Sequence, residues 1–566
     1  MHRLSKLLLF LLTYSLLFYS KIAGQCPEKI SISTDRDLYF TGETIWYKVC
    51  CLGSGTSKPS LLSKVAYFEL YNINNNPVVQ LKLYLTEGQL NSKLLLPDTL
   101  STGTYFLKGY TNWMKNYGSQ VFATKVISVI NPFTSDVSAV INNLSSDIQG
   151  EVATENKNWL QVSQTKNEYK TRSLVDLSIK KSEDVKFLTV SVARLSLLNR
   201  RGNSALPVAD KVNGINNIRD GLKHSPDHLP EPEGILISGT IRNKNNNNLL
   251  INEVITLNLV SSFPTLNISR TDNAGRFRFV VNQFGNKEMV IQPLNADTSG
   301  TGYLIELDPV FASDVRNISV NGSKFDDSDI DELNKCIINM QIEALYNSVL
   351  KNNTQTGQTF REYSFYSEPE IKVILDKYIE LPTMNEVFKE IVPAVGIRDK
   401  KNVNSFKVFG TTGALKNYFA MVDGIPIKDI NRIAAMNPED IKQIEVINLT
   451  YYFKDQELGA IISIQTKKGD LSAMNFDNRI FRQEYTGYEY SYSFSSPDYS
   501  IDSIFSSPVA DFRNVLYWNP DLKTDKEAGT LRFYTSDDTG TYLVSVEGIG
   551  PDGNKIRIEY PIKVVN

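Results

Sequence analysis

The chain of 566 residues has few of the side chains that most catalytic and metal sites need, with only 3 His and 4 Cys. Histidine is the usual acid–base group near neutral pH, and zinc sites are built mainly from His and Cys. The net charge of −3 provides no strong attraction for nucleic acid or for an anionic membrane. The composition therefore argues against most histidine-based catalysis and a His/Cys metal cage, and it predicts no nucleic-acid partner.

Common catalytic motifs are also missing. The sequence has no Gly-rich phosphate loop ending in Gly-Lys-Ser/Thr, no His-Glu-x-x-His and no Gly-x-Ser-x-Gly. His224 and His228 have the spacing of metal ligands on a helix, but Pro226 and Pro230 prevent that helix. We therefore predict no catalytic residue, no metal site and no cofactor, which makes a hydrolase the least favoured class.

The first 24 residues are typical of an export signal. His2, Arg3 and Lys6 form a basic start, an apolar stretch follows, and small residues stand at positions 23–24. The stretch is too short and interrupted for a comfortable membrane span, and no other apolar run reaches that length. We expect cleavage after residue 24 and no transmembrane span. A retained anchor and lipidation of Cys26 stay open.

Export makes disulfides possible. Cys50 and Cys51 are adjacent in a predicted strand, so their side chains point to opposite faces. Cys51 shares its face with Ile45, Tyr47 and Val49, which indicates the buried side. Cys50 would then face outward, where it could pair with Cys26.

The pattern along the chain predicts a mainly β, multidomain fold. Hydrophobic residues make up 41% and charged residues 22%, which is a globular composition. Short segments of alternating apolar and polar residues, separated by turn residues, indicate β-sandwiches. Helical periodicity indicates the helical connector, and a mixture of strand and helix patterns indicates the α+β domain. The predicted parts are a β-sandwich at 25–132, a small β-unit at 159–198, a β-sandwich at 234–310, a helical connector at 326–375, an α+β domain at 376–470 and a small β-sandwich at 510–566.

Three segments resemble known domain families. Residues 35–48, Asp-Arg-Asp-Leu-Tyr-Phe-Thr-Gly-Glu-Thr-Ile-Trp-Tyr-Lys, resemble a macroglobulin-like domain of exported Bacteroidota proteins. Residues 238–241 and 271–279 are similar to a carboxypeptidase-regulatory-like domain. Residues 422–427, 437–446 and 459–469 resemble the plug domain of TonB-dependent outer-membrane receptors. Taken in this order, the resembling segments are spread over most of the chain that follows the predicted export signal.

The plug-like motif consists of residues to which we assign structural roles. Asp423-Gly424 predicts a hairpin turn between two hydrophobic strands, Asn437-Pro438 predicts the start of a short helix, and Gly459 permits a close backbone approach. The full set is Asp423, Gly424, Pro426, Asn437, Pro438, Ile444, Glu445, Val446 and Gly459.

The resemblance implies a function in binding. A plug domain normally sits inside the barrel that follows it, but fewer than 100 residues follow Gly469, too few for about twenty strands of about ten residues each. We therefore expect a non-enzymatic exported adaptor at the outer membrane, in the periplasm with the cell surface left open. Its plug-like domain would dock on or occlude a β-barrel made by another chain. The alternative is a macroglobulin-like protease-binding or envelope-defence protein, without a thioester because no cysteine lies in a Cys-x-Glu-Gln context.

Several aromatic residues crowd the Ser-rich stretch between Tyr485 and Tyr499. Such a stretch could be a docking strand that pairs with the sheet edge of a partner. The alternative, a structured connector that packs on the plug-like domain, is favoured.

Overall fold

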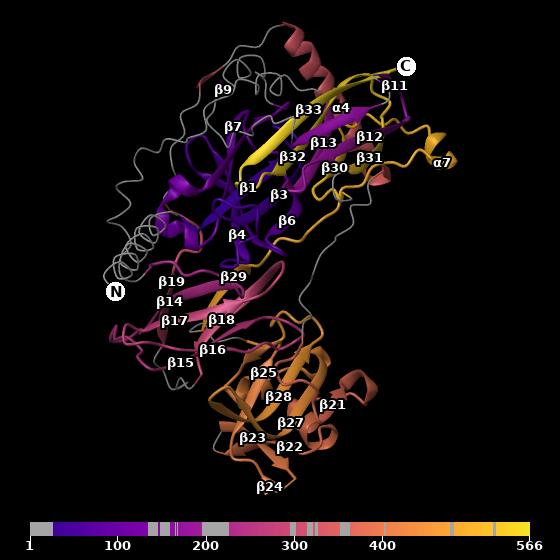
Figure 1. Ribbon diagram of the computed structural model, residues 1–566. Helices are drawn as coiled ribbons and strands as arrows, with labels where there is room; N and C mark the ends of the chain where they lie inside the picture. Colours follow the sequence, from indigo (N-terminus) through magenta and orange to yellow (C-terminus); the bar gives the residue numbers. More distant parts are fainter. Residues whose placement is uncertain are drawn as a thin grey trace, which may run out of the picture. The chain divides into compact units, whose positions relative to one another are not determined.

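The described part of the chain forms two compact units. The computed structural model describes residues 26–133, 145–147, 159–164, 166, 168–194, 226–294, 302–313, 321–322, 327–350, 363–400, 403–411, 413–475, 480–524 and 528–566. The predicted export segment and His224 lie outside these residues. Unit 1 comprises Met1–Gly234, Phe311–Gln358 and Tyr488–Asn566, and unit 2 comprises Ile235–Val310 and Thr359–Gly487. The prediction of a mainly β, multidomain fold is confirmed (Figure 1).

Sandwich 1, residues 28–130 in unit 1, is formed by two facing sheets. The sheet orders are β1-β3-β6 and β2-β8-β7-β4-β5. Tyr47 of β3 stacks on Phe68 of β4 across the interior, with ring centroids 4.5 Å apart. The elements are β1 (Glu28–Thr34), β2 (Leu38–Phe40), β3 (Thr44–Gly53), β4 (Val65–Asn72), β5 (Pro77–Tyr84), β6 (Gln89–Leu95), β7 (Gly103–Tyr110), β8 (Ala123–Ile130) and the 3-10 turns η1 (Trp113–Tyr117) and η2 (Ser119–Val121).

Sandwich 2 in unit 1 combines two segments that the sequence pattern treated as separate. The segments 159–198 and 510–566 interleave in the sheets β10-β12-β31 and β11-β33-β32-β13-β30. The prediction of two independent small β-units is therefore wrong: each segment has too few strands to cover its own apolar face. The strands are β10 (Leu160–Gln164), β11 (Glu168–Lys170), β12 (Leu174–Lys181), β13 (Lys186–Arg194), β30 (Val515–Asn519), β31 (Ala528–Tyr534), β32 (Gly540–Ile549) and β33 (Lys555–Val565).

A buried polar seam joins sandwich 1 to sandwich 2. Ser33 Oγ donates to Glu547 Oε2 at 2.5 Å, and Lys555 Nζ donates to the carbonyl oxygen of Ile32 at 2.5 Å. Burial alone would raise the pKa of Glu547, but Lys555, Arg557 and Lys125 lower it to about 2. The glutamate is therefore held ionised between the two sandwiches.

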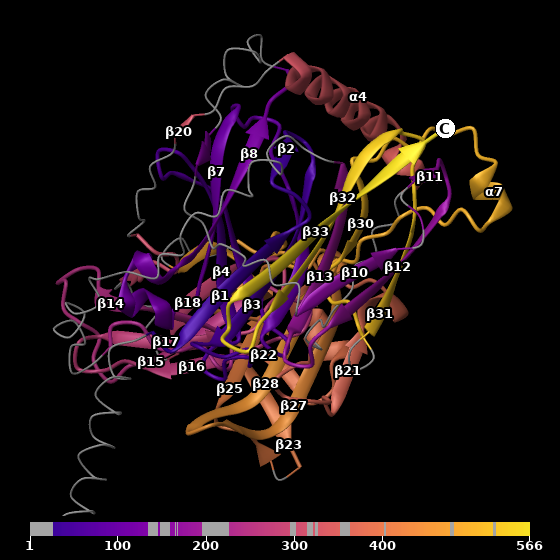
Figure 2. The ribbon, with the colours of Figure 1, turned by 45° about the horizontal axis from the view of Figure 1, so that its top comes forward.

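Helix α4 (Asp327–Leu350) packs on sandwich 1 rather than serving only as a connector (Figure 2). Leu333 and Met340 are buried against a cluster formed by Leu38, Phe40 and Ile130. Leu345, farther along the helix, is 76% exposed. Two further elements of unit 1 are α7 (Asp502–Phe505) and the strand pair of β9 (Ser145–Asp147) with β20 (Asn321–Gly322).

Sandwich 3 in unit 2 covers the predicted segment 234–310 and takes one more strand from far along the chain. Its sheets have the orders β17-β14-β19 and β16-β15-β18-β29. Strand β29 ends with the first two residues of the aromatic stretch, Tyr485 and Thr486, and the stretch then continues into unit 1, where Glu489 N donates to the carbonyl oxygen of Lys82 at 2.8 Å. It is thus a structured segment that pairs with sandwich 3 and then with sandwich 1. The strands are β14 (Ile235–Asn243), β15 (Val254–Leu259), β16 (Asn267–Arg270), β17 (Arg276–Val281), β18 (Asn286–Pro293), β19 (Tyr303–Leu307) and β29 (Phe481–Thr486).

The mixed-sheet domain, residues 363–475 in unit 2, contains the sheet β21-β27-β28-β25-β26 and the smaller sheet β22-β23-β24. Strand β21 belongs to the larger sheet, so the predicted helical connector at 326–375 extended too far. The strands are β21 (Ile371–Ile374), β22 (Val395–Lys400), β23 (Val403–Gly410), β24 (Gly413–Ala414), β25 (Tyr418–Val422), β26 (Ile425–Pro426), β27 (Ile441–Phe453) and β28 (Gln456–Thr466). The helical elements are η4 (Leu375–Lys377), α5 (Met384–Glu386), the π-helical turn η5 (Val387–Ile391), α6 (Ile430–Ala434) and η6 (Pro438–Asp440). Among the described helices, none combines the length and apolar character that crossing a bilayer requires.

Candidate functional site

The Asp423-Gly424 turn lies at the centre of the motif and joins β25 to β26. Val422 pairs with Ile425, and φ is +47° at Asp423 and +81° at Gly424. Positive φ at both central residues is typical of a type I′ hairpin turn, which Asp-Gly adopts readily. The Asp423 carboxylate is fully buried and accepts the main-chain N–H of Thr466 at 2.8 Å and that of Leu471 at 3.1 Å. The turn therefore holds the end of β28 and the segment after it.

The same turn contacts sandwich 3. Ser261 N donates to the carbonyl oxygen of Asp423 at 3.1 Å, and Gln292 Nε2 donates to that of Pro426 at 2.9 Å. A Cβ at Gly424 would lie 3.2 Å from the carbonyl oxygen of Leu259 and 3.3 Å from that of Ser261. The turn is thus enclosed by the protein's own chain.

The remaining motif residues also have internal partners. Asn437 Oδ1 accepts the main-chain N–H of Glu439 at 3.2 Å, with Pro438 at the first position of η6. Ile444 and Val446 are fully buried in the core of the mixed-sheet domain.

Glu445 and Gly459 complete the set. Glu445 accepts Tyr366 Oη at 2.7 Å and Lys372 Nζ at 2.9 Å. Gly459 has a φ of +75°, and a Cβ there would lie 2.1 Å from the carbonyl oxygen of Asn417. The structure brings all nine motif residues into one domain, where the contacts described above are structural.

One exposed surface of the mixed-sheet domain was not found by sequence reasoning. We call it the cationic face, and it consists of the outward residues of β22 and β23: Gly396, Arg398, Lys400, Val403, Ser405, Lys407 and Phe409. Residues opposite one another on paired strands share a face, whereas Phe406 and Val408 point into the core. Lys407 Nζ lies 4.6 Å from the centroid of the Phe409 ring. Arg398 and Lys400 alternate in the sequence, but only the pairing of β22 with β23 shows that Lys407 lies on the same face.

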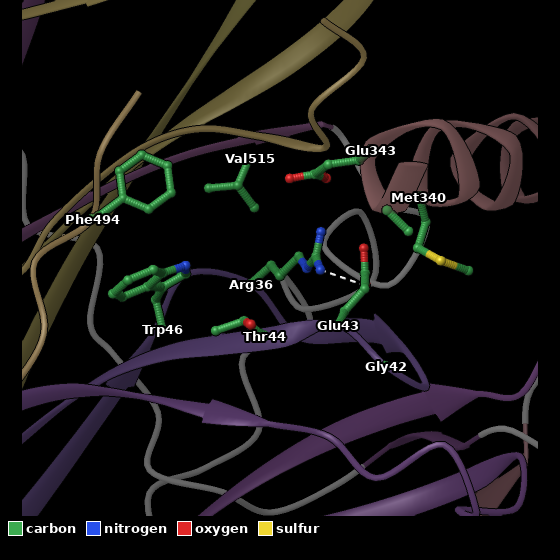
Figure 3. Close-up of a pocket in the computed structure, with 10 residues that line it drawn as sticks. Arg36, Gly42, Glu43, Thr44, Trp46, Met340, Glu343, Phe494 and Val515 are labelled. Atoms are coloured by element: carbon green, nitrogen blue, oxygen red, sulfur yellow. Dashed lines mark hydrogen bonds and ion pairs between the residues drawn. The ribbon is translucent and has the colours of Figure 1, made fainter. Parts of the chain in front are cut away.

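Unit 1 contains a small pocket between sandwich 1 and α4 (Figure 3). Arg36 Nη2 donates to Glu43 Oε2 at 2.5 Å, and Trp46 meets Phe494 edge to face with centroids 5.4 Å apart. The pocket volume is about 80 Å³, whereas drug-sized ligands occupy about 300–1,000 Å³. Water or one small polar group fits there, so the pocket is a poor candidate for a substrate site.

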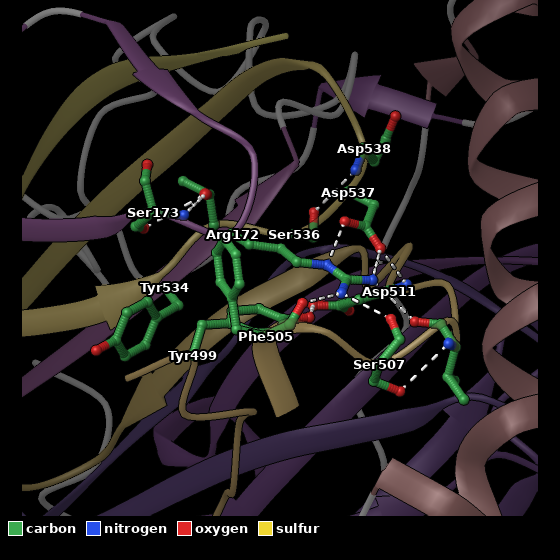
Figure 4. A network of polar contacts seen from close by, with 12 residues as sticks. Arg172, Ser173, Tyr499, Phe505, Ser507, Asp511, Tyr534, Ser536, Asp537 and Asp538 are labelled. Carbon is green, nitrogen blue, oxygen red and sulfur yellow. Dashed lines mark hydrogen bonds and ion pairs between the residues drawn. The ribbon is translucent and has the colours of Figure 1, made fainter. Parts of the chain in front are cut away.

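A polar network in unit 1 centres on Arg172 (Figure 4). Its guanidinium donates twice to the Asp537 carboxylate at 2.7 Å, and it also donates to the carbonyl oxygens of Phe505 at 2.6 Å, Ser507 at 2.8 Å and Val509 at 3.0 Å. Bidentate Arg–carboxylate pairing is strong and directional. This geometry fixes the segment around α7 on sandwich 2 and leaves no guanidinium N–H for a ligand.

The pairing of the cysteines and the burial of Cys50 differ from the prediction. All four thiols are free in the structure, so the predicted Cys26–Cys50 disulfide is not formed. Cys51 is fully buried, but Cys50 is only 4% exposed. Cys50 does not face solvent because Ile549 and Phe187 of sandwich 2 cover that side of β3. Burial raises the pKa of Cys26 and that of Cys336 to about 11, so both are poor nucleophiles at neutral pH.

His228 and Asp35 are both held by internal contacts. Among the described residues, no three His, Cys, Asp or Glu side chains form a group that could hold a metal ion. The loop of His228 is held through its main chain, with the His228 N–H donating to Asn116 Oδ1 at 3.0 Å. Burial raises the pKa of Asp35 to about 6 despite Arg36, but its side chain has no exposed surface.

Known proteins similar to this chain are found among solved structures. No family model and no curated protein matches the chain. Among solved structures, Salmonella alpha-2-macroglobulin reacted with methylamine matches at a TM-score of 0.22 and 11% identity, over 95% of this chain and 39% of that chain. Escherichia coli alpha-2-macroglobulin matches in its trypsin-activated form at 0.23 and 9%, over 96% and 42%. Its form activated by porcine elastase matches at 0.24 and 10%, over 95% and 44%.

The chain thus spans less than half the length of these solved macroglobulin chains. TM-scores and identities this low establish neither a shared activity nor a shared domain arrangement. What the fold defines is the class: a multidomain, mainly β protein built from sandwiches and one mixed-sheet domain.

Proposed function

We propose that this protein is a non-enzymatic, exported adaptor of the bacterial outer membrane. Its mixed-sheet domain would act as a plug-like module that docks on, or occludes, a β-barrel made by another chain. The resemblance of residues 422–469 to receptor plug domains motivates the proposal. Nutrient uptake, protein export and outer-membrane assembly are the processes in which such a module would serve.

One observation carries the proposal: the mixed-sheet domain is anchored at its Asp423-Gly424 turn, while none of the described residues covers its cationic face. Sandwich 3 binds the turn through Ser261 and Gln292. On the cationic face, Val403 is 62% exposed and Phe409 is 46% exposed. A domain fixed through one surface and open on another is suited to presenting the open surface to a partner.

Affinity capture of the full-length exported protein tests the proposal. Cells are extracted in mild detergent, and the tagged chain is recovered and its partners identified by mass spectrometry. We expect an outer-membrane β-barrel protein in stoichiometric amount, and its absence under crosslinking conditions would overturn the proposal. As a control, Asp455→Ala alters an exposed carboxylate outside the motif and should not change capture.

The same preparation separates the other classes. A protease-protected complex that forms when protease is added would favour the alternative, a thioester-less macroglobulin-like protease-binding protein. Turnover of a peptide or glycan that disappears on metal removal would favour an enzyme.

A further inference from the structure

We propose that the edge of β22 together with the cationic face binds an extended acidic protein segment, which adds to the sheet as a further strand. The proposal deepens the adaptor function and rests on it, because the acidic segment would belong to the docking partner. Three observations carry it: the charge of the face, the open edge of the strand and the spacing of the cations.

The cationic face carries unbalanced charge. Arg398, Lys400 and Lys407 are exposed, and none of them forms an ion pair with a described residue. No carboxylate occurs among the described residues of this face, since Asp399 pairs with Asn404 on the opposite side. The whole chain has a net charge of −3, so the cations are not a general property of the surface. An acidic partner provides the missing charge.

Strand β22 is an edge strand. It pairs with β23 alone among the described strands, because the sheet order is β22-β23-β24. An unpaired edge offers main-chain N–H and C=O groups to an incoming strand. Cations on an edge oppose pairing with a basic strand and do not oppose pairing with an acidic one. The same residues can therefore prevent self-aggregation and select the partner.

The spacing of the cations specifies the form of the partner. Arg398 and Lys400 are two residues apart on β22 and point to the same face, which places them about 6.8 Å apart along the strand. An extended segment with acidic residues at alternate positions matches that spacing. Lipid headgroups can pair with the cations, but they cannot form the main-chain hydrogen bonds that the strand edge offers. A protein segment can do both, and this favours it as the partner.

A labelled octapeptide with Glu at alternate positions, separated by Val and Thr, tests the proposal against the full-length protein by fluorescence anisotropy. Three comparison peptides are used. The first has the same composition with its Glu residues in one block, the second has Lys in place of each Glu, and the third has the original sequence with alternate amides N-methylated. We expect the alternating peptide to bind at least tenfold more tightly than each of the three. Equal binding of the blocked or N-methylated peptide would overturn strand addition.

Charge reversal locates the site. The double substitution R398E/K400E should abolish binding of the Glu peptide and create binding of the Lys peptide. The matched control K58E/K180E changes the same net charge at exposed positions of unit 1 and should leave binding unchanged. The milder pair R398Q/K400Q, with the melting temperature checked for each variant, guards against misfolding and should weaken binding at least tenfold.

Two further outcomes separate this inference from the proposed function. If anionic phospholipid vesicles bind with the same dependence on Arg398 and Lys400 while the peptide does not, the surface recognises lipid and the proposal fails. If capture recovers the barrel equally well with R398E/K400E, the adaptor function stands and this surface is not its docking site. If the peptide binds but no barrel is captured, the surface stands and the barrel proposal fails.

Discussion

Asp423 and Thr466 are joined by two hydrogen bonds, because Oδ1 accepts the Thr466 N–H at 2.8 Å and Oδ2 accepts the Thr466 hydroxyl at 2.7 Å. Oδ2 also accepts the main-chain N–H of Leu471 at 3.1 Å. A buried carboxylate with three donors is a strong local constraint, since removing it leaves buried N–H groups without partners. The turn residue thus connects two segments that are more than forty positions apart in the chain.

Asp423→Ala should destabilise the mixed-sheet domain by about 3 kcal/mol, since two main-chain N–H groups lose a charged acceptor. Asp423→Asn should cost less, because Asn keeps one acceptor oxygen and tolerates positive φ. Urea unfolding, with hydrogen exchange of β25 and β28 as the local probe, measures the difference. Asp455→Ala is the control, because that side chain is 67% exposed. Equal stability of D423A and the parent would show that the network contributes nothing.

Gly459→Ala should destabilise the same domain by about 3 kcal/mol, because the new Cβ meets main-chain atoms and the left-handed conformation is strained. That Cβ would lie 2.1 Å from the Asn417 carbonyl oxygen. Gly396→Ala is the control, since nothing lies within 4 Å of its Cβ. Thermal unfolding of the two variants should therefore differ clearly, and equal melting temperatures would contradict the close approach.

Arg172→Lys should loosen the segment around α7 and cost about 2 kcal/mol, because an ammonium group cannot reproduce bidentate pairing and three carbonyl contacts. Amide exchange of residues 500–510 should accelerate while the core of sandwich 2 keeps its protection. Arg532→Lys, in the exposed pair with Asp176, should change little. Unchanged exchange in R172K would mean that the segment is held by other contacts.

Stability should fall in acid through Glu547. Its pKa in the folded protein is about 2, below the ordinary value of 4.5. A carboxyl group whose pKa is lower in the folded than in the unfolded protein stabilises the folded state at pH values above the unfolded-state pKa. This contribution, roughly 3 kcal/mol, is lost as the pH falls from about 4.5 to about 2. Unfolding free energy measured from pH 6 to pH 2 should decline in this window.

Glu547→Gln provides the comparison for the acid limb. This variant should have lower stability at pH 6 and a flatter profile between pH 4.5 and pH 2, because it has no carboxyl proton to bind. The opposing contribution of Asp35, whose raised pKa favours folding as the pH falls through about 6, is present in both proteins and cancels in the difference. Parallel profiles would refute the assignment to Glu547.

Thiol alkylation under denaturing, non-reducing conditions should modify all four cysteines, since the structure contains only free thiols. Under native conditions Cys51, which is fully buried, should react much more slowly than Cys336. Intact mass gives the count directly. Only two modified thiols would instead support a disulfide such as Cys26–Cys50.

Local features of the fold were predictable from a few adjacent residues. The Asp423-Gly424 turn follows from the ability of Asp-Gly to adopt positive φ, and the start of η6 follows from the capping oxygen of Asn437 beside Pro438. Long-range features were not predictable in this way. Val175 of β12 pairs with Phe533 of β31, and no local pattern identifies a partner so distant in the chain.

The sequence by itself determined the β character, the Asp423-Gly424 turn and the absence of common catalytic motifs, because alternation and turn chemistry act within a few residues. Only the tertiary structure decided which strands share a sheet, why Cys50 is buried and where Arg398, Lys400 and Lys407 meet. The physical reason is that these outcomes depend on which sheet faces pack together. An apolar face is buried against whichever apolar surface the fold brings to it, regardless of distance along the chain.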